Sequence, residues 1–95
     1  MVTTASLIEK EQVRNCVFTP TSKSLNQEQI NIIHAKLYKA MILGNTCRTK
    51  VKIHFTTTEG LKIVDTTVWA YTENYILIKG GVFIPTESVI EVDGV

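Results

Sequence analysis

The feature that most constrains the fold is the run of short segments between residues 51 and 92, in which β-branched and aromatic residues recur at every second position. Such alternation places one set of side chains on each face of a strand, and glycine- or asparagine-marked turns separate the segments. One amphipathic helical segment comes directly before this run. This order predicts an α+β domain, in which the helix packs on a strongly bent antiparallel sheet or a partly open small β-barrel.

The helix is expected from about residue 27 to residue 43. Asn26 supplies an N-cap with Gln29 three residues later, and Gly44 stands where a left-handed C-terminal cap is wanted. The large and small apolar residues of the segment fall on one stripe, which should face the sheet: Ile30, Ile33, Leu37, Ala40 and Met41. We therefore expect Leu37 to meet Ile53 of the first strand in the core.

The first two strands are expected at residues 50–56 and 61–71, joined by a turn at residues 58–60. The second run loses its alternation at Asp65, Thr66 and Thr67. This change of facing indicates a bulge or sharp bend, and the polar side chains there would satisfy backbone groups that the bulge leaves open.

The remaining strands are expected at residues 75–79, 82–84 and 89–92. Glu73-Asn74 should form the first connecting turn, because Asn tolerates the positive φ that such a turn needs. Gly80-Gly81 should form the second turn for the same reason. Residues 86–88 should form a short helical turn after Pro85.

The length of 95 residues, 44% of them hydrophobic, provides for a single domain with one core. Residues 25–95 are its helix and strand meander, whereas the structure of residues 1–24 stays open. Ser6 followed by Glu9 would cap a short helix, and residues 13–18 would equally form a strand. A polar connector around Pro20 is expected at residues 19–24.

Candidate catalytic and metal-ligating side chains are few. The chain has two cysteines, Cys16 and Cys47, and two histidines, His34 and His54. Two cysteines are too few for the disulfide framework of a small secreted module, and the four residues lack the close pairs typical of structural zinc sites. We therefore expect a non-enzymatic protein without metal or cofactor, with His54 solvated on the outer face of its strand.

Membrane and secretory signals are also lacking. The longest apolar stretches, residues 40–43 and 75–78, are far shorter than the roughly 20 residues that span a bilayer. The first ten residues carry neither the basic start nor the apolar run of a secretory signal. This pattern predicts a cytoplasmic protein with no membrane partner.

Charge is unevenly distributed although the net charge is only +1. Residues 29–58 contain no Asp or Glu, and they carry five cations that would contact phosphates if they formed one patch: Lys36, Lys39, Arg48, Lys50 and Lys52. The same residues would equally form an ordinary solvated face. Trp69, Tyr71 and Tyr75 would either stack on bases or fill the core and rim of the fold.

The layout of residues 26–92 resembles the Sm-like and SH3-like small barrels. One stretch is similar to the first hairpin of such a barrel: Lys50-Val51-Lys52-Ile53-His54-Phe55 through Gly60. A second is similar to its last two strands: Val82-Phe83-Ile84-Pro85 through Val89-Ile90-Glu91-Val92. The chain also looks like the short, uncharacterised single-domain proteins common in bacterial genomes.

The resemblance implies a barrel but not the nucleobase pocket of Sm-like proteins. Those proteins hold a base with an Asp and an Asn around the turn between the second and third strands, and here Thr72 takes the place of the Asp. Pro85-Thr86 replaces the Arg-Gly or Lys-His element that often follows the fourth strand. The functional expectation is therefore a small binding or assembly module that self-associates through its sheet edges or binds a protein partner. The alternative is an RNA- or DNA-binding small barrel.

Overall fold

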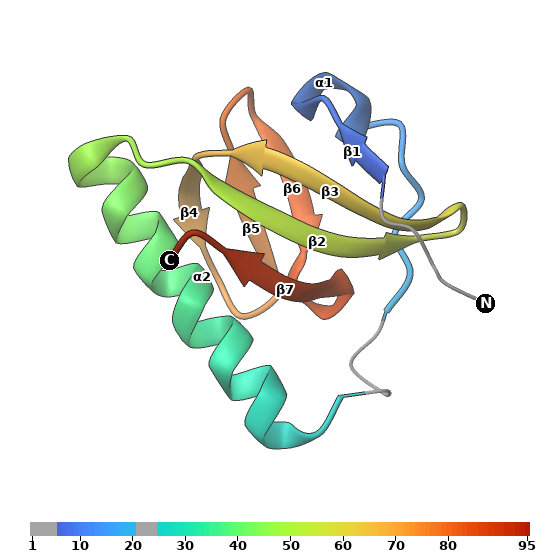
Figure 1. Ribbon diagram of the computed structural model, residues 1–95, viewed down its shortest axis with the longest axis horizontal. Helices are drawn as coiled ribbons and strands as arrows, with labels where there is room; N and C mark the ends of the chain where they lie inside the picture. The colour runs from blue at the N-terminus through green and yellow to red at the C-terminus, as the bar shows by residue number, and fades with distance from the viewer. Residues whose placement is uncertain (1–5, 21–24) are drawn as a thin grey trace.

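The computed structural model describes residues 6–20 and 25–95, which form two small β-sheets with one long helix at their side (Figure 1). The elements in chain order are β1 (Ser6–Ile8), α1 (Lys10–Val13), α2 (Gln27–Cys47), β2 (Val51–Thr57), β3 (Gly60–Thr66), β4 (Val68–Tyr71), β5 (Tyr75–Ile78), β6 (Val82–Pro85), the 3₁₀ turn η1 (Thr86–Ser88) and β7 (Val89–Asp93). The α+β class, the long helix and the strands predicted after it are confirmed.

The strands are divided between two sheets. Sheet A has the strand order β1-β3-β2-β7, and sheet B has the order β4-β5-β6. β2 is antiparallel to both β3 and β7, whereas β1 lies parallel to β3. The expectation of a purely antiparallel sheet is therefore wrong, because the N-terminal segment adds a parallel strand. Among the described residues the two sheets do not close into a barrel.

The predicted bend in the second run is confirmed at Thr67. β3 ends at Thr66 in sheet A, and β4 begins at Val68 in sheet B, so the chain passes from one sheet to the other at this residue (Figure 1). The Thr67 carbonyl accepts a hydrogen bond from the Lys79 N–H at 2.9 Å, which ties the bend to the end of β5. The buried Thr66 hydroxyl makes no hydrogen bond within the described residues. The expectation that this side chain satisfies a backbone group left open by the bend is therefore wrong.

The start of α2 follows the sequence prediction, but its end does not. Asn26 Oδ1 accepts from the Gln29 N–H at 2.8 Å, and Gln29 Oε1 accepts from the Asn26 N–H at 3.0 Å, which completes the capping box. The helix then continues through Gly44 to Cys47, and Arg48 takes the left-handed conformation with φ 54°. The expectation that Gly44 ends the helix is therefore wrong.

Gly44 is required for close packing instead. A Cβ atom added there would lie 2.5 Å from the Val68 carbonyl oxygen and 2.9 Å from Thr67 Cγ2, well inside van der Waals contact. The absence of a side chain lets α2 approach the bend between the two sheets directly.

One hydrophobic core fills the space between the helix and the sheets. α2 packs against β4 and β7 and contributes Ile33, Leu37 and Ala40 to this core. Leu37 and Ile53 are both fully buried in this one core, whereas their direct contact stays a prediction. No helix in the described ranges has the length and apolar character needed to cross a bilayer.

The N-terminal segment adopts neither of the structures considered for it. β1 pairs with β3, and the helical turn α1 is capped by Glu9 with Gln12 rather than by Ser6. Val13 is fully buried, and the Phe18 ring lies against Phe55 with a centroid separation of 5.6 Å. Of the polar connector expected at residues 19–24, residues 21–24 lie outside the described residues.

The turns of sheet B are placed as predicted, although one forms for a different reason. Gly80 and Gly81 have φ values of 98° and 80°, as their turn requires. Asn74 does not adopt a positive φ. The Thr72 hydroxyl oxygen organises this turn by accepting the N–H groups of Asn74 and Tyr75 at 3.2 and 3.0 Å.

Truncation of Leu37 tests the packing of α2. Leu37→Ala should lower the free energy of unfolding by about 2–5 kcal/mol, because it removes a fully buried side chain and leaves a cavity. Chemical denaturation followed by circular dichroism measures this loss. Lys39→Ala, at an exposed position two residues away, should stay within about 0.5 kcal/mol of the parent protein. Equal stability of Leu37→Ala and the parent would rule out the helix-on-sheet core.

Candidate functional site

The structure separates the five cations that the sequence singled out. Arg48 and Lys50 line one hollow together, and Lys39 is exposed on α2. Lys36 Nζ lies 3.0 Å from Glu91 Oε1. Lys52 is the register partner of two acidic residues, Asp65 on β3 and Asp93 on β7. Arg48 and Lys50 therefore share a hollow with no acidic residue in its described lining, although Lys50 also borders a neighbouring hollow with Asp65 and Asp93. Two others, Lys36 and Lys52, lie beside carboxylates.

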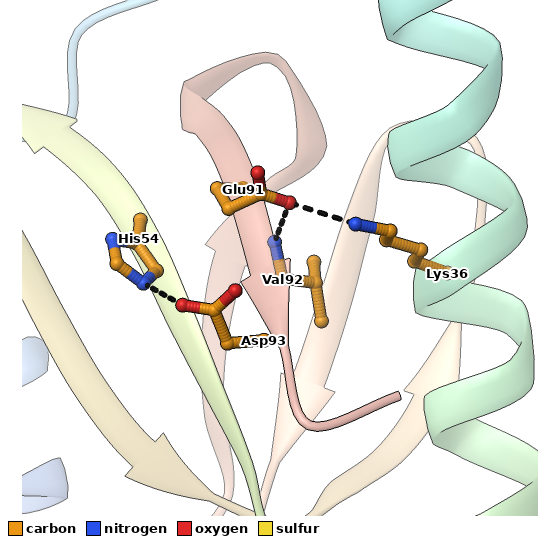
Figure 2. A network of polar contacts seen from close by, with 5 residues as sticks. All are labelled: Lys36, His54, Glu91, Val92 and Asp93. Atoms are coloured by element: carbon orange, nitrogen blue, oxygen red, sulfur yellow. Dashed lines mark hydrogen bonds and ion pairs between the residues drawn. The ribbon is translucent and has the colours of Figure 1, made fainter.

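The acidic end of the chain forms a polar network with β2 and α2. Figure 2 shows Lys36 reaching from α2 to Glu91 on β7, while Glu91 also accepts from the Val92 N–H at 3.0 Å. His54 Nε2 lies 2.8 Å from Asp93 Oδ2. The expectation of a merely solvated His54 is therefore wrong, because β7 brings a carboxylate beside it.

The candidate site is the hollow around Arg48 and Lys50, which we call the basic recess. It has a volume of about 380 Å³. The polar, charged and aromatic residues that line it and could contact a ligand include Asn45, Arg48, Lys50, Trp69 and Lys79. Among the described residues that line it there are three cations and no carboxylate.

Four elements and the bend between the sheets position the basic recess. Arg48 follows α2, Lys50 precedes β2, Trp69 lies near the start of β4, and Lys79 follows β5. Gly44 and Thr67 line it from the helix and the bend.

Two groups of hydrogen bonds hold the backbone of the basic recess. Asn45 Nδ2 donates to the Trp69 carbonyl at 3.2 Å, which joins the last turns of α2 to β4. The Arg48 N–H donates to the Gly44 carbonyl at 3.1 Å, and the Thr49 N–H donates to the Leu43 carbonyl at 3.3 Å. A left-handed residue with a Cβ costs about 1–2 kcal/mol, and these capping bonds help to offset that cost. The position of Arg48 is thereby fixed by the end of the helix.

The aromatic residues that the sequence grouped together lie in different surroundings. Trp69 and Tyr75 are each 44% exposed. Tyr71 instead is half-buried, with its ring against His34 and Tyr38 on α2 and its hydroxyl hydrogen-bonded to His34. Burial, reinforced by the Glu73 carboxylate, raises the pKa of Tyr71. Of the three, Trp69 alone lines the basic recess.

Sequence reasoning missed that Lys79 and Trp69 belong with Arg48 and Lys50. The proximity of Trp69 to Lys79 could have been found from the sequence. The predicted turn at residues 73–74 pairs Val68 with Ile78, the residues that precede Trp69 and Lys79. The approach of α2 to this hairpin depends on Gly44, which the sequence pattern assigned to the helix end instead.

A second hollow lies near the start of α2 and has a different character. It has a volume of about 120 Å³ and an apolar lining that includes Leu25, Ile30 and Ile33. Glu73 and Glu87 lie at the same hollow, and their charge would repel an anion. It is therefore not a candidate for phosphate binding.

The cysteines and histidines do not assemble into a reactive site. Within the described residues no hydrogen bond joins a thiol to a histidine, and no group of three or more His, Cys, Asp or Glu residues is placed to hold a metal ion. Burial is the main cause that raises the pKa of the Cys16 thiol; Lys62 opposes the shift and Glu59 adds to it. A raised pKa leaves less of the nucleophilic thiolate.

Comparison with models of protein families, with curated proteins and with solved structures finds no match for this chain.

The contact between Lys36 and Glu91 should be visible in the titration of the Glu91 carboxyl. The hydrogen bond from Lys36 is the main cause that lowers the pKa of the Glu91 carboxyl, followed by the bond from the Val92 N–H. Lys36→Gln should raise that pKa toward its ordinary value, though only in part because Val92 still donates. Side-chain carboxyl shifts in an NMR titration measure the change.

The same pair makes only a small contribution to stability. Its side chains are 35% and 48% exposed, so solvent screening limits the contribution to about 1 kcal/mol or less. Since the folded pKa of Glu91 is lowered, this contribution is present above the unfolded pKa and is lost as the pH falls through the folded one. Lys39→Gln, which removes the same charge from an exposed site on α2, should leave the Glu91 titration unchanged. An unshifted Glu91 in Lys36→Gln would contradict the contact.

Proposed function

We propose that this chain is a non-enzymatic binding module whose ligand is single-stranded nucleic acid, held through its phosphates at the basic recess. The observation that carries the proposal is the convergence of Arg48, Lys50 and Lys79 from separate parts of the chain on one hollow. Phosphate contacts by Lys and Arg supply most of the affinity in sequence-independent nucleic-acid binding. The proposal requires no catalytic group in the recess.

Ordinary helix electrostatics explain only part of this arrangement. Arg48 and Lys50 follow the C-terminal end of α2, where cations are favourable because the helix end carries about half a negative charge. Lys79 comes from sheet B and has no such relation to the helix by sequence. Three full positive charges also exceed the half charge that the helix end presents, so the recess remains attractive to an anion.

The absence of an assembled reactive site supports a non-enzymatic role. Within the described chain, His34 is engaged by Tyr71 and His54 by Asp93. Cys16 Sγ lies 3.6 Å from the Gln12 carbonyl oxygen, as in a helical contact rather than a nucleophile–base pair.

We further propose that the fold is a variant of the Sm-like and SH3-like layout. Two features support this: β3 and β4 form a bent run that joins the sheets, and η1 returns the chain so that β7 pairs with β2. A nucleic-acid ligand does not depend on this relationship, because the basic recess is distinct from the turn at which Sm-like proteins hold a base.

Salt dependence tests the phosphate contacts. Each phosphate contact to a single strand steepens the fall of log affinity by about 0.7 per log unit of salt. Simultaneous replacement of Arg48, Lys50 and Lys79 by Gln should therefore reduce the slope by about 2 and weaken binding at low salt. Fluorescence anisotropy of a labelled single-stranded oligonucleotide over a salt series measures both quantities.

A matched control removes the same total charge elsewhere. Simultaneous replacement of Lys36, Lys39 and Lys52 by Gln also lowers the net charge by three, but Lys36 and Lys52 lie beside carboxylates and all three are outside the recess. This control should keep most of the parent slope. Equal loss in both triple variants would show a diffuse charge effect, and no binding by the parent protein at low salt would overturn the proposal.

A second candidate function, self-association, is favoured by the edge strand β6. β6 lies at the edge of sheet B, and its four residues carry no charge. Phe83 is 53% exposed, and its ring meets Tyr75 edge to face at a centroid separation of 4.9 Å. An uncharged edge strand with unpaired backbone groups readily pairs with another chain. A second copy of the protein is the proposed partner.

A charge placed on this edge should disrupt that assembly. Phe83→Lys is expected to weaken self-association at least tenfold, or about 1.4 kcal/mol, because it puts a cation into an apolar contact. Sedimentation velocity over a range of protein concentrations measures the effect, with Tyr38→Lys on α2 as the control. A parent protein that sediments only as a monomer at micromolar concentration would contradict this second function.

A further inference from the structure

The basic recess contains an exposed indole beside its cations, which charge alone does not explain. Trp69 is 44% exposed, whereas its neighbour Val68 is fully buried. We propose that the recess holds one nucleotide unit of a single strand, with the phosphate on the cations and the base stacked on the Trp69 indole. This inference rests on the proposed function and adds to it that bases, not only phosphates, are bound.

Trp69 lies at a local irregularity of the edge strand β4 in sheet B. The pairing of β4 with β5 shifts register between Val68 and Ala70, so Trp69 lies at a bulge in the strand. Bulges commonly redirect a side chain next to a binding site. A tryptophan that served only the core would gain stability by full burial, and this one leaves nearly half of its surface in water.

The backbone beneath the indole is held in place before any ligand binds. Asn45 Nδ2 donates to the Trp69 carbonyl at 3.2 Å, and Gly44 brings the helix against the carbonyl of Val68. Stacking on a fixed backbone costs less ordering than stacking on a mobile loop. The indole is therefore a ready platform rather than one assembled by the ligand.

The combination selects for single strands. A base in a duplex already stacks on its neighbours and is paired, so it cannot present its face to an indole without being extruded. A single strand offers both a free base face and a flexible phosphate path. The recess volume of about 380 Å³ is within the range of roughly 300–1,000 Å³ for small-ligand sites. One nucleotide, rather than a duplex groove, is the unit that matches it.

Trp69 is the only tryptophan of the chain, so its fluorescence reports directly on the proposed contact. Three probes separate the contributions: a mixed-sequence single-stranded oligonucleotide, an abasic strand with the same number of phosphates, and the duplex of the first, which carries twice as many. The single strand should bind with strong quenching of Trp69. The abasic strand and the duplex should bind more weakly and cause little quenching.

Variants of Trp69 then measure the contribution of stacking. Trp69→Leu should weaken binding of the single strand about 5- to 150-fold, since stacking on one base is worth about 1–3 kcal/mol, and should scarcely change binding of the abasic strand. Trp69→Phe should recover part of the loss because it keeps an aromatic ring. Tyr38→Leu removes an exposed aromatic residue from α2 outside the recess and should leave binding unchanged. Circular dichroism melts check that each variant is folded.

The outcomes distinguish this inference from the proposed function. Equal affinity and equal quenching for the normal and abasic strands would overturn base stacking while phosphate binding stands, and this comparison uses only the parent protein. Unchanged binding by a folded Trp69→Leu would overturn it as well. Absence of binding by either strand at low salt would overturn both proposals.

Discussion

The contact of Gly44 with the bend between the two sheets is the constraint on which the basic recess depends. A side chain there would begin 2.5 Å from the Val68 carbonyl oxygen, so only glycine allows α2 to lie this close. The helix can then continue to Cys47 beside β4 and end with Arg48 next to the recess. Asn45 reaches the Trp69 carbonyl across the same contact. One missing side chain thus brings the end of the helix, the indole and the cations together.

Packing at this contact and the charge of the site are physically linked. Because the helix does not end at Gly44, the left-handed cap falls to Arg48, a residue with a Cβ that pays about 1–2 kcal/mol for that conformation. A glycine or asparagine would adopt it more easily but would remove a cation from the recess. Strained residues that persist in this way are often found at functional sites, where the strain positions a group. The geometry of Arg48 is therefore a second reason, independent of charge, to place the site here.

The sequence predicts local structure well where one periodicity or one cap dominates. The capping box of Asn26 and Gln29, the bend at Thr67 and the turn at Gly80-Gly81 each follow from a few neighbouring residues and are confirmed. Two of the failures depend on contacts between distant segments. β1 pairs parallel with β3, and Gly44 meets Val68, 24 residues further along the chain by their numbers; neither contact leaves a periodic signal.

Contacts between distant segments also decide which cations meet, so the sequence predicts only Arg48 and Lys50 of the candidate site. An acid-free stretch of sequence suggested one patch, but β7 returns its own acidic residues to β2 and α2, so Glu91 lies beside Lys36 and Asp93 beside His54. Of the other cations, only Arg48 and Lys50 line the basic recess, where they are joined by Lys79 from another part of the sequence. The net charge of +1 is therefore divided between two different surfaces, one where opposite charges meet and one where three cations and Trp69 line a single hollow, with Lys50 bordering both. Since Coulomb interactions act over distances in space and are screened beyond about 10 Å, the spatial grouping of charges, and not their order along the chain, decides which surface attracts an anion.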